Sequence, residues 1–242
     1  MKRSFLVWAL FLGIWVVPPA TSRGLALSPV GTWEVSIVGS DKGTSIMTFS
    51  NDLTVTGCGI TRDQIGFFTL AGNWSVDAHG SVIVSYVLST NGVGSGGASF
   101  TARLLRSGRF RGKGRDNHGK GLHFNGEQPS NLPGLTGTWT AVVKRRGNTL
   151  LETYDITAST NFPAVFDVTG NGSSETAGSY TLTGTIIATP NNKLNASIDR
   201  TFGADTQRSS LAGRVKHKDS DMRLKGHDDA NVHLSIKAVN GP

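Results

Sequence analysis

Basic residues are crowded between positions 103 and 123 of this 242-residue chain, and their side chains could bind an anion. Against a single aspartate they give a net charge of +6 over 21 residues. On a strand, Arg109, Arg111 and Lys113 would share one face. Such a surface would suit phosphate or sulfate groups of lipopolysaccharide, an acidic glycan or nucleic acid, whereas the alternative is a solvated face that keeps a sheet edge from pairing. We define the cationic ribbon as Arg103, Arg106, Arg109, Arg111, Lys113, Arg115 and Lys120.

The charge of the whole chain, +7, says less about partners than this local excess. Lys2, Arg3 and Arg23 lie in an N-terminal segment that is predicted to be removed, which reduces the charge to +4. Residues 31–136 and 137–242 then carry +2 each. The balance favours solubility and argues against nucleic acid as a partner.

Two glycine-rich stretches match phosphate-binding sequence motifs only in part. Residues 92–97 spell Gly-x-Gly-x-x-Gly, and residues 114–120 spell Gly-x-x-x-x-Gly-Lys. Both motifs need a helix directly after the loop, but Ser99 to Leu105 and Leu122 to Phe124 alternate like strands. The sequence therefore predicts a glycine-rich strand connector over residues 91–97 and a hairpin turn at residues 114–120.

No set of residues indicates catalysis, a metal site or a cofactor. His227, Asp228 and His233 are close in sequence, but a zinc site needs three or four converging ligands at a suitable spacing. Cys58 is the single cysteine and has no nearby histidine. The carboxylates Glu34, Glu152 and Asp155 lie on predicted strands, where only distance in space would make an acid and base pair. We assign no catalytic residue and favour a protein that is not an enzyme.

The N-terminus has the layout of a secretory signal peptide. Lys2 and Arg3 precede an apolar run over residues 5–17, and small residues follow the prolines at 18 and 19. Thirteen apolar residues are fewer than the roughly 20 that a spanning helix needs. We therefore expect a signal peptide over residues 1–26, cleaved after Ser22 or Ala26, no transmembrane span in the mature chain, and a periplasmic or extracellular protein.

The rest of the chain has the periodicity of antiparallel strands arranged in two similar halves. Gly31-Thr32-Trp33 recurs as Gly137-Thr138-Trp139, 106 residues later, and each copy opens a run of alternating apolar and polar residues. Leu70-Ala71-Gly72 similarly matches Leu182-Thr183-Gly184, and Gly126 matches Gly226. Each half has about eight short strands joined by tight turns, which is enough to close a small barrel. No segment keeps a helical period.

The sequence thus predicts an all-β protein of two tandem antiparallel meander barrels. Barrel domain 1 is expected over residues 27–128, a linker with two prolines over 129–134, and barrel domain 2 over 135–242.

These openings resemble the lipocalin and avidin group of up-and-down barrels. Leu135 to Trp139 is similar to an avidin opening, and Tyr180 to Gly184 is similar to a later strand of that family. The resemblance implies that Trp33 and Trp139 plug one end of each barrel, while the other end receives a ligand. The biotin-contacting asparagine of the avidin pattern is replaced by Ala141, so no biotin residue carries over.

Three functions remain open from the sequence. The first is an exported, non-enzymatic protein that binds a small apolar ligand or an acidic envelope polymer, such as an acidic glycan or a lipid headgroup. The second is a structural or envelope protein-interaction module with solid barrels, and the third is a hydrolase or isomerase in a barrel mouth. A cavity would separate the first from the second, and buried carboxylates in one pocket would favour the third.

Overall fold

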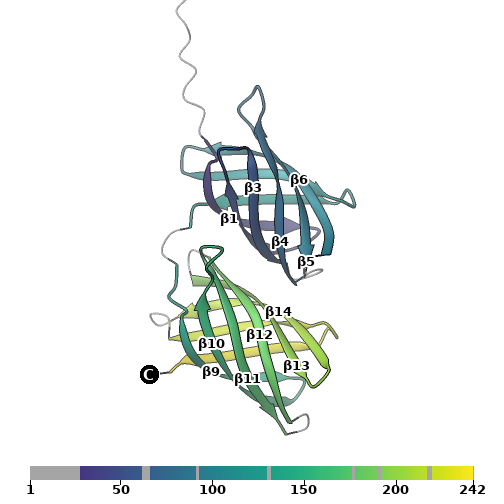
Figure 1. The fold of residues 1–242 in the computed structure, drawn as a ribbon, viewed down its shortest axis with the longest axis vertical. Coiled ribbons are helices and arrows are strands. Elements are labelled where there is room, and N and C mark those ends of the chain that lie inside the picture. Colours follow the sequence, from purple (N-terminus) through teal and green to yellow (C-terminus); the bar gives the residue numbers. More distant parts are fainter. Residues whose placement is uncertain are drawn as a thin grey trace, which may run out of the picture.

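The fold consists of two closed β-barrels in tandem, as predicted (Figure 1). This computed structural model describes residues 28–61, 66–90, 93–129, 132–175, 178–189, 192–216 and 220–241. The predicted signal peptide, residues 1–26, lies outside these described residues. Among the described residues there is no helix long and apolar enough to cross a membrane.

Barrel 1 contains eight strands that pair antiparallel with their neighbours in chain order, and β8 pairs back onto β1. Its strands are β1 (Gly31–Gly39), β2 (Gly43–Phe49), β3 (Thr54–Thr61), β4 (Gly66–Val76), β5 (Val82–Thr90), β6 (Val93–Leu105), β7 (Arg109–Asp116) and β8 (Gly121–Glu127). Closure leaves no free sheet edge in the barrel.

Barrel 2 repeats this plan, with β16 pairing back onto β9. Its strands are β9 (Gly137–Arg145), β10 (Asn148–Ala158), β11 (Val165–Ser174), β12 (Gly178–Thr189), β13 (Lys193–Phe202), β14 (Asp205–Lys216), β15 (Asp221–Asp228) and β16 (His233–Asn240).

The two tryptophans occupy the same local structure in both barrels. The Trp33 indole Nε1 donates a hydrogen bond to the Pro29 carbonyl at 2.6 Å, and the Trp139 indole donates to the Leu135 carbonyl at 2.8 Å. Each tryptophan is buried and follows a glycine with a φ near +120°. Since few side chains tolerate that φ, the Gly-Thr-Trp repeat reflects a conformational requirement.

Strand register aligns the two barrels residue by residue. Each tryptophan is paired with a residue on the next strand, and the pairing continues over four further strands in all. This gives two equivalent rows of cross-strand neighbours. They are Trp33, Met47, Gly57, Leu70 and Leu88 in barrel 1, and Trp139, Tyr154, Gly170, Leu182 and Arg200 in barrel 2. The predicted match of Leu70 with Leu182 is therefore confirmed.

Two details of the sequence interpretation are wrong. Gly126 lies on the eighth strand of its barrel and Gly226 on the seventh, so they are not equivalent. Both are glycines because an added Cβ would collide with a neighbour, Phe110 at 2.2 Å for Gly126 and a backbone oxygen at 1.9 Å for Gly226. The predicted connector over residues 91–97 also fails, because β6 already begins at Val93. There, an added Cβ on Gly97 would lie 2.6 Å from the Tyr86 carbonyl.

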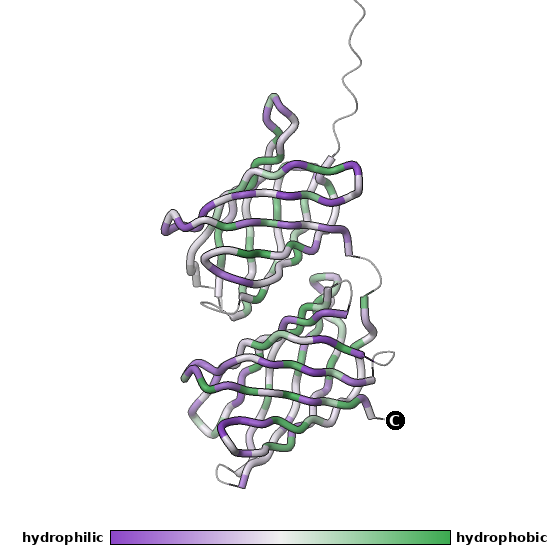
Figure 2. Tube along the Cα trace, turned by 180° about the vertical axis from the view of Figure 1, so that it is seen from behind, coloured by the Kyte–Doolittle hydropathy of each residue, from purple (hydrophilic) through white to green (hydrophobic). Residues whose placement is uncertain are grey.

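Hydrophobic and hydrophilic residues alternate along many of the strands (Figure 2), and buried positions alternate with exposed ones. The exception is where the barrels meet, because outward residues of β2 and β3 are buried against barrel 2. This inter-barrel cluster contains Ile46, Cys58 and Ile60 from barrel 1 and Ala164, Val165 and Ile187 from barrel 2. The Asn195 side-chain amide also donates to the Thr44 hydroxyl at 2.9 Å. The barrels therefore share an interface with an apolar centre and a polar margin.

Candidate functional site

A cavity of about 500 Å³ opens at the end of barrel 1 opposite to Trp33. Strand β1 runs from Trp33 to Ile37, which lines the cavity, and then into the turn after Gly39. We call this space the mouth cavity. Its walls are inward-facing apolar side chains from five strands, namely Ile37, Phe68, Tyr86, Leu88, Ala98 and Leu122. Apolar walls of this kind suit an apolar ligand.

One polar group inside the mouth cavity has no partner. The Thr61 hydroxyl is buried, and it has no hydrogen-bond partner among the described residues. A buried hydroxyl left unpaired costs about 1–3 kcal/mol, so a ligand that hydrogen-bonds to it would recover this energy. Burial also raises the pKa of Tyr86 well above its ordinary value, which keeps the phenol neutral in the cavity wall.

The rim of the mouth cavity is polar and draws on both barrels. Asp116 accepts hydrogen bonds from the backbone amides of His118 and Lys120 at 2.9 and 2.8 Å. Although partial desolvation opposes them, these hydrogen bonds lower the pKa of Asp116. From barrel 2, Arg208 reaches the same rim while it forms a bidentate ion pair with Asp199 at 2.8 Å. The hairpin turn predicted at residues 114–120 is limited to residues 117–120, because β7 continues to Asp116, and it supplies part of the rim.

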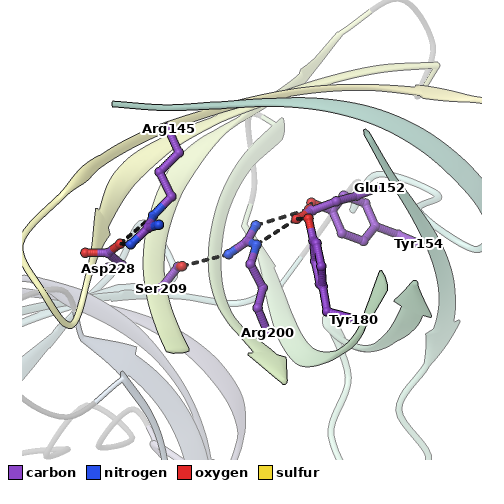
Figure 3. A network of polar contacts seen from close by, with 7 residues as sticks. All are labelled: Arg145, Glu152, Tyr154, Tyr180, Arg200, Ser209 and Asp228. Atoms are coloured by element: carbon purple, nitrogen blue, oxygen red, sulfur yellow. Dashed lines mark hydrogen bonds and ion pairs between the residues drawn. The ribbon is translucent and has the colours of Figure 1, made fainter. Parts of the chain in front are cut away.

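The same place in barrel 2 is filled by a buried polar network (Figure 3). By strand register, Glu152, Tyr180 and Arg200 are the equivalents of Ser45, Phe68 and Leu88 in barrel 1. The Tyr180 ring covers Gly172 as the Phe68 ring covers Gly59. The two barrels therefore differ in what occupies the same part of the interior.

Every polar group of this network has a partner. The Arg200 guanidinium donates to both Glu152 carboxylate oxygens, at 2.6 and 3.1 Å, and to the Ser209 hydroxyl at 2.7 Å. The hydroxyls of Tyr154 and Tyr180 also donate to Glu152. Neither charged side chain has any exposed surface. The groups of this network are thus already hydrogen-bonded to one another, although Glu152 and Tyr180 also line an open pocket of about 1170 Å³ in barrel 2.

The cationic ribbon lies on the outer face of β6 and β7 and in the two turns at the ends of β7. All seven side chains are exposed. Arg103 and Arg111 are directly opposite one another across the two strands, and Lys113 faces His123 on β8. Like charges directly opposite each other destabilise a sheet. The fold therefore accepts a local electrostatic cost at this face.

Only some members of the ribbon have partners. Arg109 forms an ion pair with Glu127 at 3.0 Å, and the Arg115 guanidinium donates to the Gly119 carbonyl at 2.7 Å. Among the described residues, Arg103, Arg111 and Lys113 form no ion pair. Arg106 and Lys120 likewise form no ion pair among these residues, so most of the positive charge of the ribbon is available.

The other residues considered from the sequence lie apart from these sites. His227 and His233 are cross-strand neighbours with ring centroids 5.3 Å apart. Asp228 accepts a hydrogen bond from the Val232 amide and pairs with Arg145 at 2.7 Å. Among the described residues, no cluster of three or more His, Cys, Asp or Glu side chains could hold a metal ion. Cys58 is buried in the inter-barrel cluster, where desolvation raises its thiol pKa to about 12.

Sequence reasoning missed the buried charges. Glu152 and Arg200 occupy the alternate positions at which the inward-facing apolar residues of β10 and β13 lie, and this pattern indicates that both side chains enter the core. Thr61, the last residue of β3, likewise occupies one of the alternate positions that face inward on that strand. Glu34 gives no such signal, because it alternates outward and is buried only by the other barrel.

No protein-family model and no curated protein sequence matches the chain. Among solved structures, a redesigned β-barrel bound to DFHBI is 14% identical with a TM-score of 0.39, over 44% of this chain and 94% of that one. A protein of unknown function from the DUF3598 family of Nostoc punctiforme is 13% identical with a TM-score of 0.30, over 88% and 96%. Transferrin-binding protein B of Haemophilus parasuis is 9% identical with a TM-score of 0.20, over 88% and 75%. At TM-scores this low, these likenesses carry no conclusion about this chain.

Proposed function

We propose that this chain is a non-enzymatic binding protein that holds a small, mainly apolar ligand in the mouth cavity of barrel 1. The observation that carries this proposal is the unpartnered Thr61 hydroxyl within an apolar cavity of about 500 Å³. Small-molecule sites in proteins typically measure about 300–1,000 Å³ and combine apolar walls with a few polar groups. The ligand expected here has an apolar body and one group that hydrogen-bonds to Thr61.

Native mass spectrometry on protein purified from its own host tests this proposal. We expect a discrete non-covalent adduct that is lost on denaturation, and that is absent from Leu88→Trp, in which the cavity is filled. The matched control is Thr101→Trp, on the exposed face of β6. If the native protein and both variants each show only the mass of their own polypeptide, with no adduct, the alternative of a solid structural module is favoured instead. An adduct retained by Leu88→Trp would place the ligand elsewhere.

Once the adduct is identified, Thr61→Val measures the contribution of the hydroxyl. The substitution keeps the volume of the side chain and removes its hydrogen bond. We expect the affinity to fall about three- to tenfold, the usual effect of one neutral hydrogen bond. Unchanged affinity would mean that Thr61 does not anchor the ligand.

A second candidate function is binding of an acidic glycan by the cationic ribbon. The observation in its favour is Arg103 opposite Arg111, without a compensating acid among the described residues. We expect Arg103→Ala with Lys113→Ala to weaken salt-sensitive binding to a sulfated glycan, while Lys225→Ala on barrel 2 leaves it unchanged. If the protein binds vesicles with anionic lipids but not the glycan, the ligand of the cationic ribbon is a lipid headgroup and not a glycan. If Lys225→Ala weakens glycan binding equally, the binding depends on the overall charge of the protein and not on the cationic ribbon.

We propose in addition that the protein is exported. Support comes from the basic and apolar residues at positions 2–17. The mass of the protein purified from its own host shows whether residues before Arg23 or Leu27 have been removed. A mature protein that retains Met1 to Ala20 would contradict export by this route.

A further inference from the structure

A second pocket, of about 330 Å³, lies where the two barrels meet, around Glu34. Glu34 alternates outward on β1, yet its exposed fraction is only 8% because barrel 2 covers it. The hydrogen bond between Asn195 and Thr44 closes one side of this inter-barrel pocket. The pocket therefore exists only when both barrels are in place.

The Glu34 carboxyl group in this pocket is incompletely satisfied. Its Oε2 atom is buried and has no hydrogen-bond partner among the described residues. Across the sheet, Glu34 faces Glu127, whose carboxylate is held by Arg109 at 3.0 Å. Desolvation, with a smaller effect of Glu127, raises the pKa of Glu34 to about 8, although Lys193 opposes the shift. At neutral pH the group is therefore a neutral carboxylic acid that can donate its proton to a hydrogen bond.

Besides Glu127, the other charged side chains that line the pocket are positive. Arg109 is neutralised by Glu127, but Arg111 and Lys193 form no ion pair among the described residues. The side-chain amides of Asn125 and Asn195 also line the pocket and can donate hydrogen bonds. A cation would be repelled here, whereas an oxyanion would meet two ammonium or guanidinium groups and several donors.

We propose that the inter-barrel pocket binds an oxyanion, a carboxylate or a tetrahedral phosphate or sulfate group, between Arg111, Lys193 and the carboxyl group of Glu34. This site is distinct from the mouth cavity and does not depend on the ligand proposed there. It shares Arg111 with the cationic ribbon, but its other groups come from β1 and from barrel 2.

The proposal predicts a specific pH dependence. The charged groups that face Glu34 are Glu127, Arg109 and Arg111 from barrel 1 and Lys193 from barrel 2. Ionised Glu34 would repel an oxyanion and lose its donor. With a pKa of about 8, only about one Glu34 in ten stays protonated at pH 9, so the affinity should fall about tenfold between pH 6 and pH 9.

Titration calorimetry with sulfate and with glucuronate, two probes that keep their charge over this pH range, tests the site on the full chain. We expect binding at pH 6 that weakens through pH 8, and the stronger probe identifies a tetrahedral or a carboxylate group. Glu34→Gln, which keeps a neutral donor, should bind equally at pH 6 and pH 9. Lys193→Ala and Arg111→Ala should each lower the affinity about tenfold.

Lys225→Ala is the matched control, because Lys225 is an exposed lysine of barrel 2 that lies outside both the pocket and the cationic ribbon. It should leave binding unchanged. Binding that responds to Lys113→Ala and not to Lys193→Ala would assign the anion to the cationic ribbon and overturn the proposal. No binding of either probe at pH 6, or the same pH dependence in Glu34→Gln as in the native protein, would also overturn it.

Discussion

Replacing Arg200 by methionine should destabilise barrel 2 strongly, because it leaves the Glu152 carboxylate buried without its cation. Arg200 provides three charge-assisted hydrogen bonds of 2.6, 2.7 and 3.1 Å, and its side chain has no exposed surface. Methionine fills much of the volume but restores none of these hydrogen bonds. Removal of one partner from a buried ion pair costs about 3–5 kcal/mol.

The expected change is large compared with the stability of such a domain. For a barrel of about 100 residues, 1 kcal/mol corresponds to a shift in Tm of about 4–8 °C. Arg200→Met should therefore lower the Tm of barrel 2 by about 12 °C or more. Scanning calorimetry measures this shift, and the transition of barrel 1 should change much less, because its core cluster does not include residues of barrel 2.

The double variant Glu152→Gln with Arg200→Met decides whether the cost comes from an unpaired charge. With both charges removed, the destabilisation should be smaller than that of Arg200→Met alone, since buried ion pairs add little over neutral replacements. A loss below about 1 kcal/mol in the single variant would refute the reasoning. Strictly additive losses in the double variant would equally show that the two side chains are not coupled.

Three further predictions concern the tryptophans, Glu34 and Cys58. Trp33→Phe and Trp139→Phe each leave a buried carbonyl without its hydrogen-bond donor. Urea unfolding should therefore show that the free energy of unfolding falls by about 1–3 kcal/mol in the affected barrel only. Equal effects on the transitions of both barrels would contradict independent barrel cores. Because its folded pKa is raised to about 8, Glu34 contributes stability that is complete below its ordinary pKa of 4.5 and is lost as the pH rises through 8. The free energy of unfolding of Glu34→Gln should thus match that of the native protein near pH 4.5 and exceed it at pH 9 by about 1–2 kcal/mol after allowance for screening. A constant difference across this range would contradict the shift. Cys58 should react with a disulfide reagent at pH 8 only after unfolding, since its thiol is buried with a pKa of about 12; rapid labelling of native protein would mean that the barrels separate readily.

Local patterns in the sequence were sufficient to predict two eight-stranded barrels. Trp33 and Trp139 mark the first strands because the glycine two residues before each tryptophan adopts a rare φ in both barrels. Inward and outward positions follow from alternation, as Phe110 between Arg109 and Arg111 shows. These features are local, since a strand fixes the direction of each side chain within two residues.

The sites depend on distances that alternation cannot give. Arg200 and Glu152 are 48 residues apart, and their pairing needs the stagger between strands that closure imposes. The inter-barrel pocket is harder still, because Thr44 and Asn195 are 151 residues apart and belong to different barrels. From sequence alone, Glu34 reads as an exposed residue on the outer face of β1. Its burial and its unpaired oxygen follow only from how the barrels sit together.

The two barrels have different residues at equivalent positions of their interiors. At three matched positions, barrel 1 has Ser45, Phe68 and Leu88 where barrel 2 has the charged and phenolic groups of its network. The smaller and neutral set leaves a cavity with an unpaired hydroxyl, whereas the ionic set satisfies all of its groups internally. A buried ion pair adds little stability over apolar packing, so its clearest effect here is to occupy the interior. Barrel 2 also covers Glu34 and supplies Arg208 to the rim of the mouth cavity in barrel 1.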